Sequence, residues 1–204
     1  MNNAEEQTAG QAAGQIKQPV RLSAGRPALS LSLIALFAAL VAAGTFVSIP
    51  LPFTPVPVVL QNLFSLLAGL ALGPVSGGAA VGLYLLAGII GAPVFAGAAG
   101  GIVHILGPTG GFLIGYLLSA FTAGLICGRP RRGTPLWRII LAVVAGLLVI
   151  YVPGIIRLRF AVGSWDKALA AGFIPFVIGD AIKGFLAVLI APRLRRLVAD
   201  QSGR

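Results

Sequence analysis

Charged residues are scarce in this sequence, since Asp, Glu, Lys and Arg make up 10% of its 204 residues. Soluble globular domains carry about 25% charged residues, so this class is excluded. From Pro27 to Gly128, about a hundred residues, the chain has no charged side chain at all. That length accommodates four membrane helices of about 20 residues each. The sequence therefore predicts an integral membrane protein.

Cysteine and histidine are almost absent, with Cys127 and His104 as the single examples. One cysteine excludes a disulfide framework and a Cys-rich metal site, and a catalytic zinc site needs three protein ligands. The chain also lacks the HExxH and GxSxG patterns and a phosphate-binding loop. We therefore predict no catalytic residues, no metal and no cofactor, and the first rival reading, an intramembrane enzyme, is disfavoured.

Acidic residues are outnumbered by basic ones, five to fifteen, but the basic residues do not form a patch typical of nucleic-acid binding. They lie at the ends of apolar segments, as in cytoplasmic loops of membrane proteins. Eleven fall on one predicted side: Lys17, Arg21, Arg26, Arg129, Arg131, Arg132, Arg138, Arg193, Arg195, Arg196 and Arg204. This pattern predicts a multi-pass membrane protein with both termini in the cytoplasm.

The apolar segments predict an all-α fold of six transmembrane helices in one bundle, spanning residues 28–198. Residues 1–27 and 199–204 are predicted to be short cytoplasmic tails, the first disordered. A signal peptide is disfavoured because the first apolar run is too long for one. The predicted helices are about 28–49, 58–72, 75–90, 111–127, 136–151 and 175–198.

The connection from Ala92 to Gly111 contains six glycines and two prolines but no charge. A segment this apolar is unlike a loop that is exposed to solvent. Irregular backbone is tolerated within the membrane where it lines a cavity or packs against protein. It is predicted to be an outer loop between the third and fourth helices. It acts either as a lid over a pocket or as a compact packed loop. The candidate lid residues are Gly107, Pro108, Thr109, Gly110 and Gly111.

Two further patterns leave alternatives open. Ala35, Ala39 and Ala43 recur every four residues, and such small residues let two helices approach closely, either within the bundle or with a partner. The predicted outer side carries Arg157, Arg159 and Lys167. These three charges either attract an anionic solute or form a solvated edge.

Asp180 and Lys183 lie inside the last apolar segment, three residues apart and therefore on one face of a helix. Charged groups in a membrane helix are costly and commonly mark a substrate or ion pathway. The pair is accordingly our main candidate for a solute-binding site. The alternative is an internal ion pair that only fixes helix packing.

Four segments together resemble the BioY family, the biotin-specific S components of energy-coupling-factor (ECF) transporters. They are PLPFTPVPVVLQNL, LYLLAGIIGAPVFAG, GPTGGFLIGY and PFVIGDAIKGFLA, in that order. The resemblance implies high-affinity biotin uptake by a six-helix membrane protein. It also implies a place in the bacterial inner membrane and two kinds of partner, a transmembrane coupling subunit and ATPase subunits, through which alone ATP acts. The small-residue face of Ala35, Ala39 and Ala43 would dock the coupling subunit.

By position, the resemblance implies a substrate site containing Asp180, Lys183, Gln61 and Tyr84. We expect Asp180 to accept a hydrogen bond from the ureido group of biotin and Lys183 to donate to a ligand oxygen. Phe53, Phe95 and Phe176 are expected to supply the apolar wall. The sequence differs from the family pattern at Ala98, where the family commonly has glycine. This difference affects the expected backbone geometry of the loop.

A second rival is a stand-alone proton-coupled carrier with Asp180 as its proton site. Such carriers often contain internal repeats, and none is found in this sequence.

Overall fold

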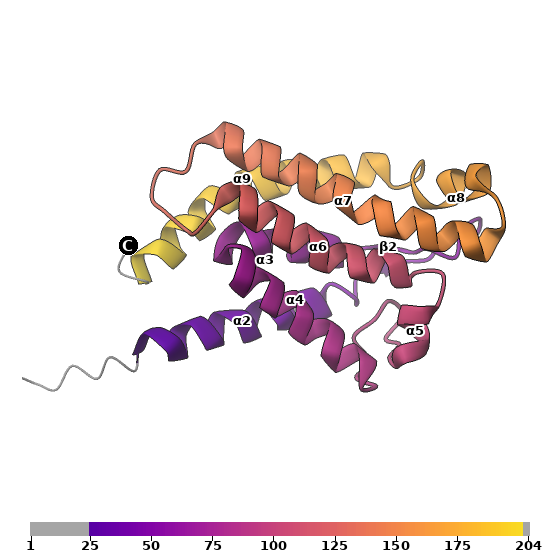
Figure 1. Cartoon of the computed structure of the whole chain (residues 1–204), viewed down its shortest axis with the longest axis horizontal. Coiled ribbons are helices and arrows are strands. Elements are labelled where there is room, and N and C mark those ends of the chain that lie inside the picture. The colour runs from indigo at the N-terminus through magenta and orange to yellow at the C-terminus, as the bar shows by residue number, and fades with distance from the viewer. Residues whose placement is uncertain (1–24, 202–204) are drawn as a thin grey trace, which may run out of the picture.

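The computed structural model describes residues 25–201, and most of them are helical (Figure 1). In chain order the elements are α2 (Gly25–Ala43), β1 (Ser48–Ile49), β2 (Val58–Val59), α3 (Gln61–Leu72), α4 (Pro74–Ile89), α5 (Ile102–Leu106), α6 (Gly110–Cys127), α7 (Leu136–Val162), α8 (Trp165–Gly172) and α9 (Val177–Gln201). The predicted tails fall largely on residues 1–24 and 202–204, which lie outside the described residues, so their disorder stays a prediction.

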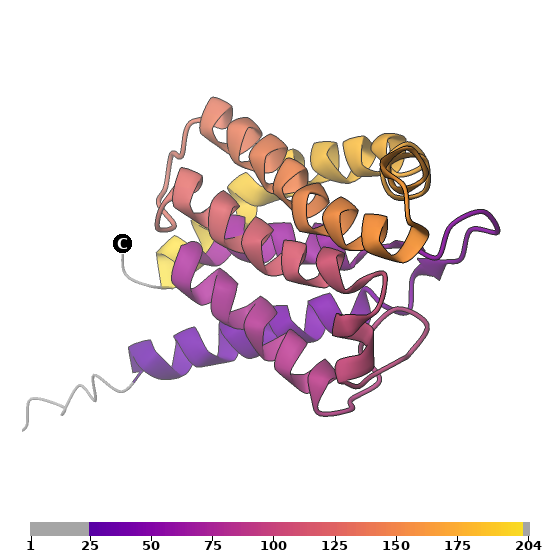
Figure 2. The same ribbon diagram turned by 45° about the vertical axis from the view of Figure 1, so that its right-hand side comes forward.

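The long helices run side by side and give the bundle two distinct ends (Figures 1 and 2). We call them the terminal end, where α2 begins and α9 ends, and the cavity end, where the short hairpin, α5 and α8 lie. In the hairpin, Ser48 pairs with Val59 and Ile49 with Val58 in antiparallel register. The proline-rich residues 50–57 form its non-helical tip, as expected for a segment that cannot continue a helix.

Helix α3 occupies the centre of the bundle and contacts α2, α4, α6, α7 and α9. Eleven of its twelve residues are buried. A helix of twelve residues is about 18 Å long, shorter than the roughly 30 Å hydrocarbon core of a bilayer. The helix is thus too short to cross a bilayer by itself, and two of its polar residues, Gln61 and Asn62, are in its first turn.

Glycines let the central helices approach closely. A Cβ atom on Gly69 of α3 would lie 2.1 Å from the Ala120 carbonyl oxygen of α6. A Cβ atom on Gly111 of α6 would lie 2.1 Å from the Pro153 carbonyl oxygen of α7. Side chains larger than glycine would push these backbones apart, so the spacing of α3, α6 and α7 depends on the two glycines.

Helices α6 and α7 are each long and apolar enough to cross a membrane. Helices α8 and α9 meet the same criterion together, as a pair bent by 48°. The apolar stretches in Ala28–Ala43, α3 and α4 are shorter than this criterion requires. Between residues 25 and 201 there are thus two membrane-capable helices, or three if the bent pair is one span. The chain is a mostly helical membrane protein.

Two helix ends differ clearly from the sequence-based prediction. The first helix ends at Ala43 and not at residue 49, because the next residue, Gly44, packs against the start of α3. A Cβ atom on Gly44 would lie 2.9 Å from the Gln61 backbone nitrogen. The fifth predicted helix continues past residue 151 and through Pro153 to Val162. It ends at Gly163, which has φ 79° and donates its N–H to the Arg159 carbonyl at 2.8 Å.

The glycine-rich connection between α4 and α6 is partly ordered by its own backbone. Phe95 and Ala99 exchange two backbone hydrogen bonds of 2.8 and 3.1 Å, and α5 follows. Ala98, at the turn between them, has φ 57°, a left-handed conformation that favours glycine. The departure seen in the sequence thus falls on the residue whose backbone is least suited to alanine.

Arg195 closes the terminal end, although it was predicted only as one of the charges that orient the chain. It is 1% exposed, and its guanidinium donates to backbone carbonyls at the ends of two helices. The acceptors are Leu70, Cys127, Gly128 and Arg129, and Nε also donates to Thr134 Oγ1 at 2.9 Å. Carbonyls at helix C-termini carry partial negative charge, so they stabilise this buried cation.

Replacing Arg195 by Leu is expected to lower the free energy of unfolding by at least about 2 kcal/mol, since several buried carbonyls lose their donor. Arg195→Lys should recover only part of the loss, because an ammonium lacks the planar fork of donors. The measurement is thermal unfolding in detergent. Arg196→Leu, a change at the exposed next residue, is the control, and equal losses in Arg195→Leu and Arg196→Leu would contradict the bridging role.

Candidate functional site

Asp180 and Lys183 face each other in the first turns of α9. Lys183 Nζ donates to Asp180 Oδ1 at 3.0 Å, and the two residues are 7% and 6% exposed. Their spacing puts them one turn apart on the buried face of the helix, as the sequence predicted. A buried pair of opposite charges remains ionised only when each partner stabilises the other.

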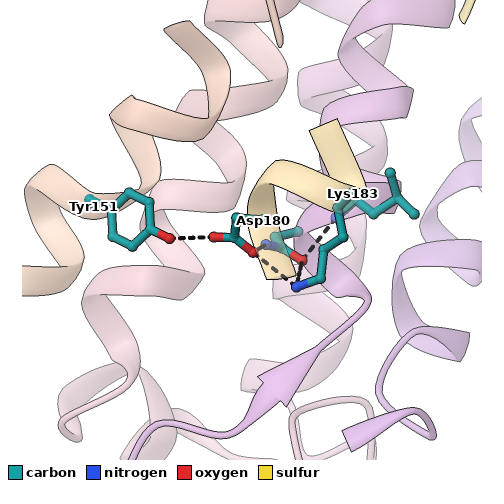
Figure 3. A network of polar contacts seen from close by, with 5 residues as sticks. Tyr151, Asp180 and Lys183 are labelled. Atoms are coloured by element: carbon teal, nitrogen blue, oxygen red, sulfur yellow. Dashed lines mark hydrogen bonds and ion pairs between the residues drawn. The ribbon is translucent and has the colours of Figure 1, made fainter. Parts of the chain in front are cut away.

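Two more side chains complete this charged cluster (Figure 3). Asn62, from α3, donates Nδ2–H to Asp180 Oδ1 at 2.8 Å and accepts from Lys183 Nζ at 3.1 Å. Tyr151, from α7, donates its hydroxyl to the other oxygen, Asp180 Oδ2. Three helices therefore meet at one carboxylate. We refer to Asn62, Tyr151, Asp180 and Lys183 as the charged cluster.

The charged cluster keeps some hydrogen-bonding capacity free for a solute. An ammonium has three N–H donors, and Lys183 uses two of them, on Asp180 and Asn62. A carboxylate has about four acceptor positions, and Asp180 uses three within the described residues. One donor, on Lys183, and one acceptor position, on Asp180 Oδ2, are thus left in the same cluster. That arrangement suits a ligand with an N–H group next to a carbonyl oxygen.

Two cavities lie at this level of the bundle. The deep cavity, about 30 Å³, reaches the charged cluster and is also lined by Phe176. The outer cavity, about 440 Å³, is lined by Gln61, Phe95 and His104 among others. Its volume is typical of small-molecule sites. The cavities share five lining residues: Val56, Pro57, Val59, Phe112 and Tyr116. They therefore adjoin each other, and we treat them as one site with a polar floor.

Gln61 anchors a second polar cluster beside the outer cavity. Its Nε2 lies 2.5 Å from Thr45 Oγ1, 2.8 Å from the Tyr84 hydroxyl and 3.0 Å from the Val94 carbonyl oxygen. The Phe95 ring packs edge-on against Tyr84, with centroids 5.7 Å apart. These contacts fix the wall of the outer cavity, because they tie α3 to α4 and to the loop after it.

Two segments cover the outer cavity at the cavity end. The hairpin supplies Thr54, whose hydroxyl donates to the Ala171 carbonyl of α8 at 2.7 Å. The connection around α5 is held by Arg157, which donates Nε–H to the Gly107 carbonyl oxygen at 3.2 Å and Nη2–H to that of Leu106. Arg157 was predicted either to attract anions or to form a solvated edge. Its contacts give it a third role, as an anchor of the α5 segment.

The residues that the sequence predicted for the site occupy different places. Asp180 and Lys183 belong to the charged cluster; Gln61, Phe95 and Thr109 line the outer cavity, and Phe176 lines the deep one. Tyr84 is 1% exposed, lines neither cavity and supports Gln61 from behind. Phe53 is 65% exposed and lines neither cavity, because it lies at the tip of the hairpin.

Among the predicted lid residues, only Thr109 reaches the cavity. Gly110 and Gly111 begin α6. A Cβ on Gly110 would lie 1.7 Å from the Ile105 carbonyl oxygen, so close packing explains this glycine pair. Whether the segment moves as a lid stays a prediction.

Sequence reasoning did not assign three residues that the structure places at the site: Asn62, Tyr116 and Tyr151. Asn62 had a visible signal, because it is an amide beside Gln61 in an apolar helix. The two tyrosines had none, since tyrosine is common at helix ends and in packed cores. Among residues 25–201, no group of three or more His, Cys, Asp or Glu side chains is placed to hold a metal ion.

A family model described as BioY family matches residues 16–200. The chain belongs to the BioY family. Among curated relatives, a probable biotin transporter BioY from Pyrococcus horikoshii is 45% identical over 168 residues, which cover 82% of this chain and 97% of the relative. The biotin transporter BioY from Thermotoga maritima is 42% identical over 166 residues, covering 81% and 95%.

A solved structure gives the same assignment in three dimensions. The crystal structure of the S-component for biotin from an ECF-type ABC transporter superposes on this BioY-family chain with a TM-score of 0.76. The two are 31% identical, and the match covers 83% of this chain and 92% of the other. The family resemblance seen in the four sequence segments is thus confirmed.

Removing one member of the ion pair should cost far more stability than removing both. Lys183→Met leaves a buried carboxylate without its cation, and we expect a loss of about 3–5 kcal/mol. The double variant Asp180→Asn/Lys183→Met should recover most of this loss. Thermal unfolding in detergent without ligand is the measurement, with Lys167→Met, an exposed lysine of α8, as control. A double variant no more stable than Lys183→Met would show that the two charges are not coupled.

Proposed function

We propose that this protein captures biotin and serves as the substrate-specific subunit of an ECF-type transporter for biotin uptake. The observation that carries the proposal is the charged cluster, which lines a deep cavity that adjoins an outer cavity of ligand size. Family membership adds support, because the relatives named above are biotin transporters. Transport, and not catalysis, is the activity we assign. The protein needs no cofactor of its own, and ATP acts only through partner subunits.

The chemistry of biotin matches the charged cluster. Its ureido ring offers two N–H donors that flank one carbonyl acceptor. The free acceptor position of Asp180 can accept from an N–H group, and the free N–H of Lys183 can donate to the carbonyl oxygen. Charge-assisted hydrogen bonds of this kind are about twice as strong as neutral ones. The ligand's own carboxylate is expected to stay away from Asp180, because like charges repel at low dielectric. It therefore points into the outer cavity.

Six membrane spans with cytoplasmic termini fit this function. The described chain starts and ends at the same end of the bundle (Figure 1), which an even number of spans requires. Most basic residues lie toward that end, and such residues accumulate on the cytoplasmic side. In this orientation the cavity opens outward, where biotin is captured. The helices α2, α3 and α4 are short spans, and the non-helical segments next to them complete the crossing of the membrane.

The small-residue stripe of α2 is the proposed docking face for a coupling subunit. Ala35, Ala39 and Ala43 are all exposed, whereas Phe37, Ala38 and Val41 on the other face are buried. The stripe therefore does not serve packing within the described bundle, and a helix of another subunit can approach it closely. This favours the second of the two readings left open by the sequence.

Biotin binding tests the site directly. We expect Asp180→Asn and Lys183→Ala each to weaken binding by about 10- to 100-fold, the value of a hydrogen bond to a charged group. Equilibrium binding of labelled biotin to the purified protein in detergent is the measurement. Asp166→Asn is the matched control, because this carboxylate is exposed on α8. Affinities near wild type in both site variants would refute the role of the pair.

Uptake tests the partnership. Ala39→Trp should leave biotin binding by the purified protein unchanged but abolish uptake by cells that contain the coupling and ATPase subunits, because the indole keeps the helices apart. Val144→Trp, on an exposed face of α7, should affect neither. Uptake that persists without any ATPase partner and is abolished by an uncoupler would instead support a stand-alone proton-coupled carrier.

A further inference from the structure

Tyr116 lines a cavity, and its hydroxyl has no hydrogen-bond partner among the described residues. The residue lies in the second turn of α6 and is 7% exposed. Its hydroxyl makes no hydrogen bond within residues 25–201, whereas both other tyrosines do, Tyr84 with Gln61 and Tyr151 with Asp180. A hydroxyl that borders a cavity and has no partner in the protein can both donate to and accept from a ligand there. A group kept in this state is a candidate for contact with a ligand.

The position of Tyr116 points to the same role. It lines both the deep and the outer cavity, and the other shared lining residues, Val56, Pro57, Val59 and Phe112, are apolar. Tyr116 is therefore the one polar side chain among those common to the two cavities. A solute that passes from the outer cavity to the charged cluster must contact it.

The hydrogen-bonding capacity of the charged cluster suggests which ligand group Tyr116 receives. Asp180 has one acceptor position free and Lys183 one donor, as derived above. A ureido ring with two N–H groups and one carbonyl oxygen then has one N–H left without an acceptor. That N–H needs an uncharged acceptor at the wall of the deep cavity, and the Tyr116 oxygen is available there.

We propose that Tyr116 is a specificity-determining residue whose hydroxyl oxygen accepts a hydrogen bond from the second ureido N–H of the ligand. This inference rests on the proposed function and deepens it. Asp180, Lys183 and Tyr116 then contact all three polar positions of the ring, and the site selects cyclic ureas over ligands that offer a single N–H.

Tyr116→Phe tests the assignment because it removes only the hydroxyl. We expect biotin affinity to fall by about 3- to 10-fold, measured by equilibrium binding in detergent. Dethiobiotin, which keeps the ureido ring and carboxylate but has no sulfur, should lose affinity by the same factor. Without ligand, the unfolding temperature of Tyr116→Phe should equal that of wild type, because the hydroxyl makes no hydrogen bond within residues 25–201.

Ser119→Ala is the matched control. Ser119 lies one turn further along α6, is fully buried, has an unpartnered hydroxyl and lines neither cavity. Its affinity for biotin should equal that of wild type.

Three results would overturn the assignment of Tyr116: unchanged biotin affinity in Tyr116→Phe, a loss seen with biotin but not dethiobiotin, or a lower unfolding temperature without ligand. Failure of the proposed function would look different. In that case wild type itself would not bind biotin, or Asp180→Asn would bind it as well as wild type does.

Discussion

A carboxylate and an ammonium inside a membrane protein constrain everything around them. Neither charge is stable at low dielectric unless it is paired and hydrogen-bonded. Here Asp180 obtains one donor each from α3, α7 and α9. The three helices must therefore hold fixed positions relative to one another. The same requirement makes the site ready for a ligand, because the groups that stabilise the charges are already oriented toward the deep cavity.

The short central helix satisfies this constraint. If α3 crossed the whole membrane, its first turn would lie at the surface, and Asn62 would be far from Asp180. The helix has only twelve residues, and the hairpin of residues 48–59 precedes it. Glycines at positions 69 and 111 then allow α6 to approach both α3 and α7. Short length and small residues together bring Asn62, Tyr151 and Asp180 within hydrogen-bonding distance.

A second buried charge stabilises the opposite end by a different mechanism. Arg195 has no carboxylate partner within residues 25–201. Backbone carbonyls after α6, together with one near the end of α3, neutralise it instead. The two ends of α9 thus carry one charge site each, one built for a ligand and one for packing. Burial alone does not distinguish them. The two sites differ in their remaining hydrogen-bonding capacity. Asp180 and Lys183 border a cavity and keep hydrogen-bonding positions free, whereas Arg195 is surrounded by its own acceptors.

The sequence by itself determined the membrane class, the family and the pairing of Asp180 with Lys183, because apolar runs, motif order and a three-residue helical spacing are local properties of the chain. It located the main helices but missed the ends of two of them, since Gly44 stops α2 through contact with α3 and α7 continues through Pro153.

Only the tertiary structure brought Asn62, Tyr116 and Tyr151 to the site and left Phe53 outside it. These placements depend on how closely three helices pack and on where the hairpin turns. The contacts that join Tyr151 and Asn62 to Asp180 span 29 and 118 positions of the chain, and no local pattern in the sequence encodes them.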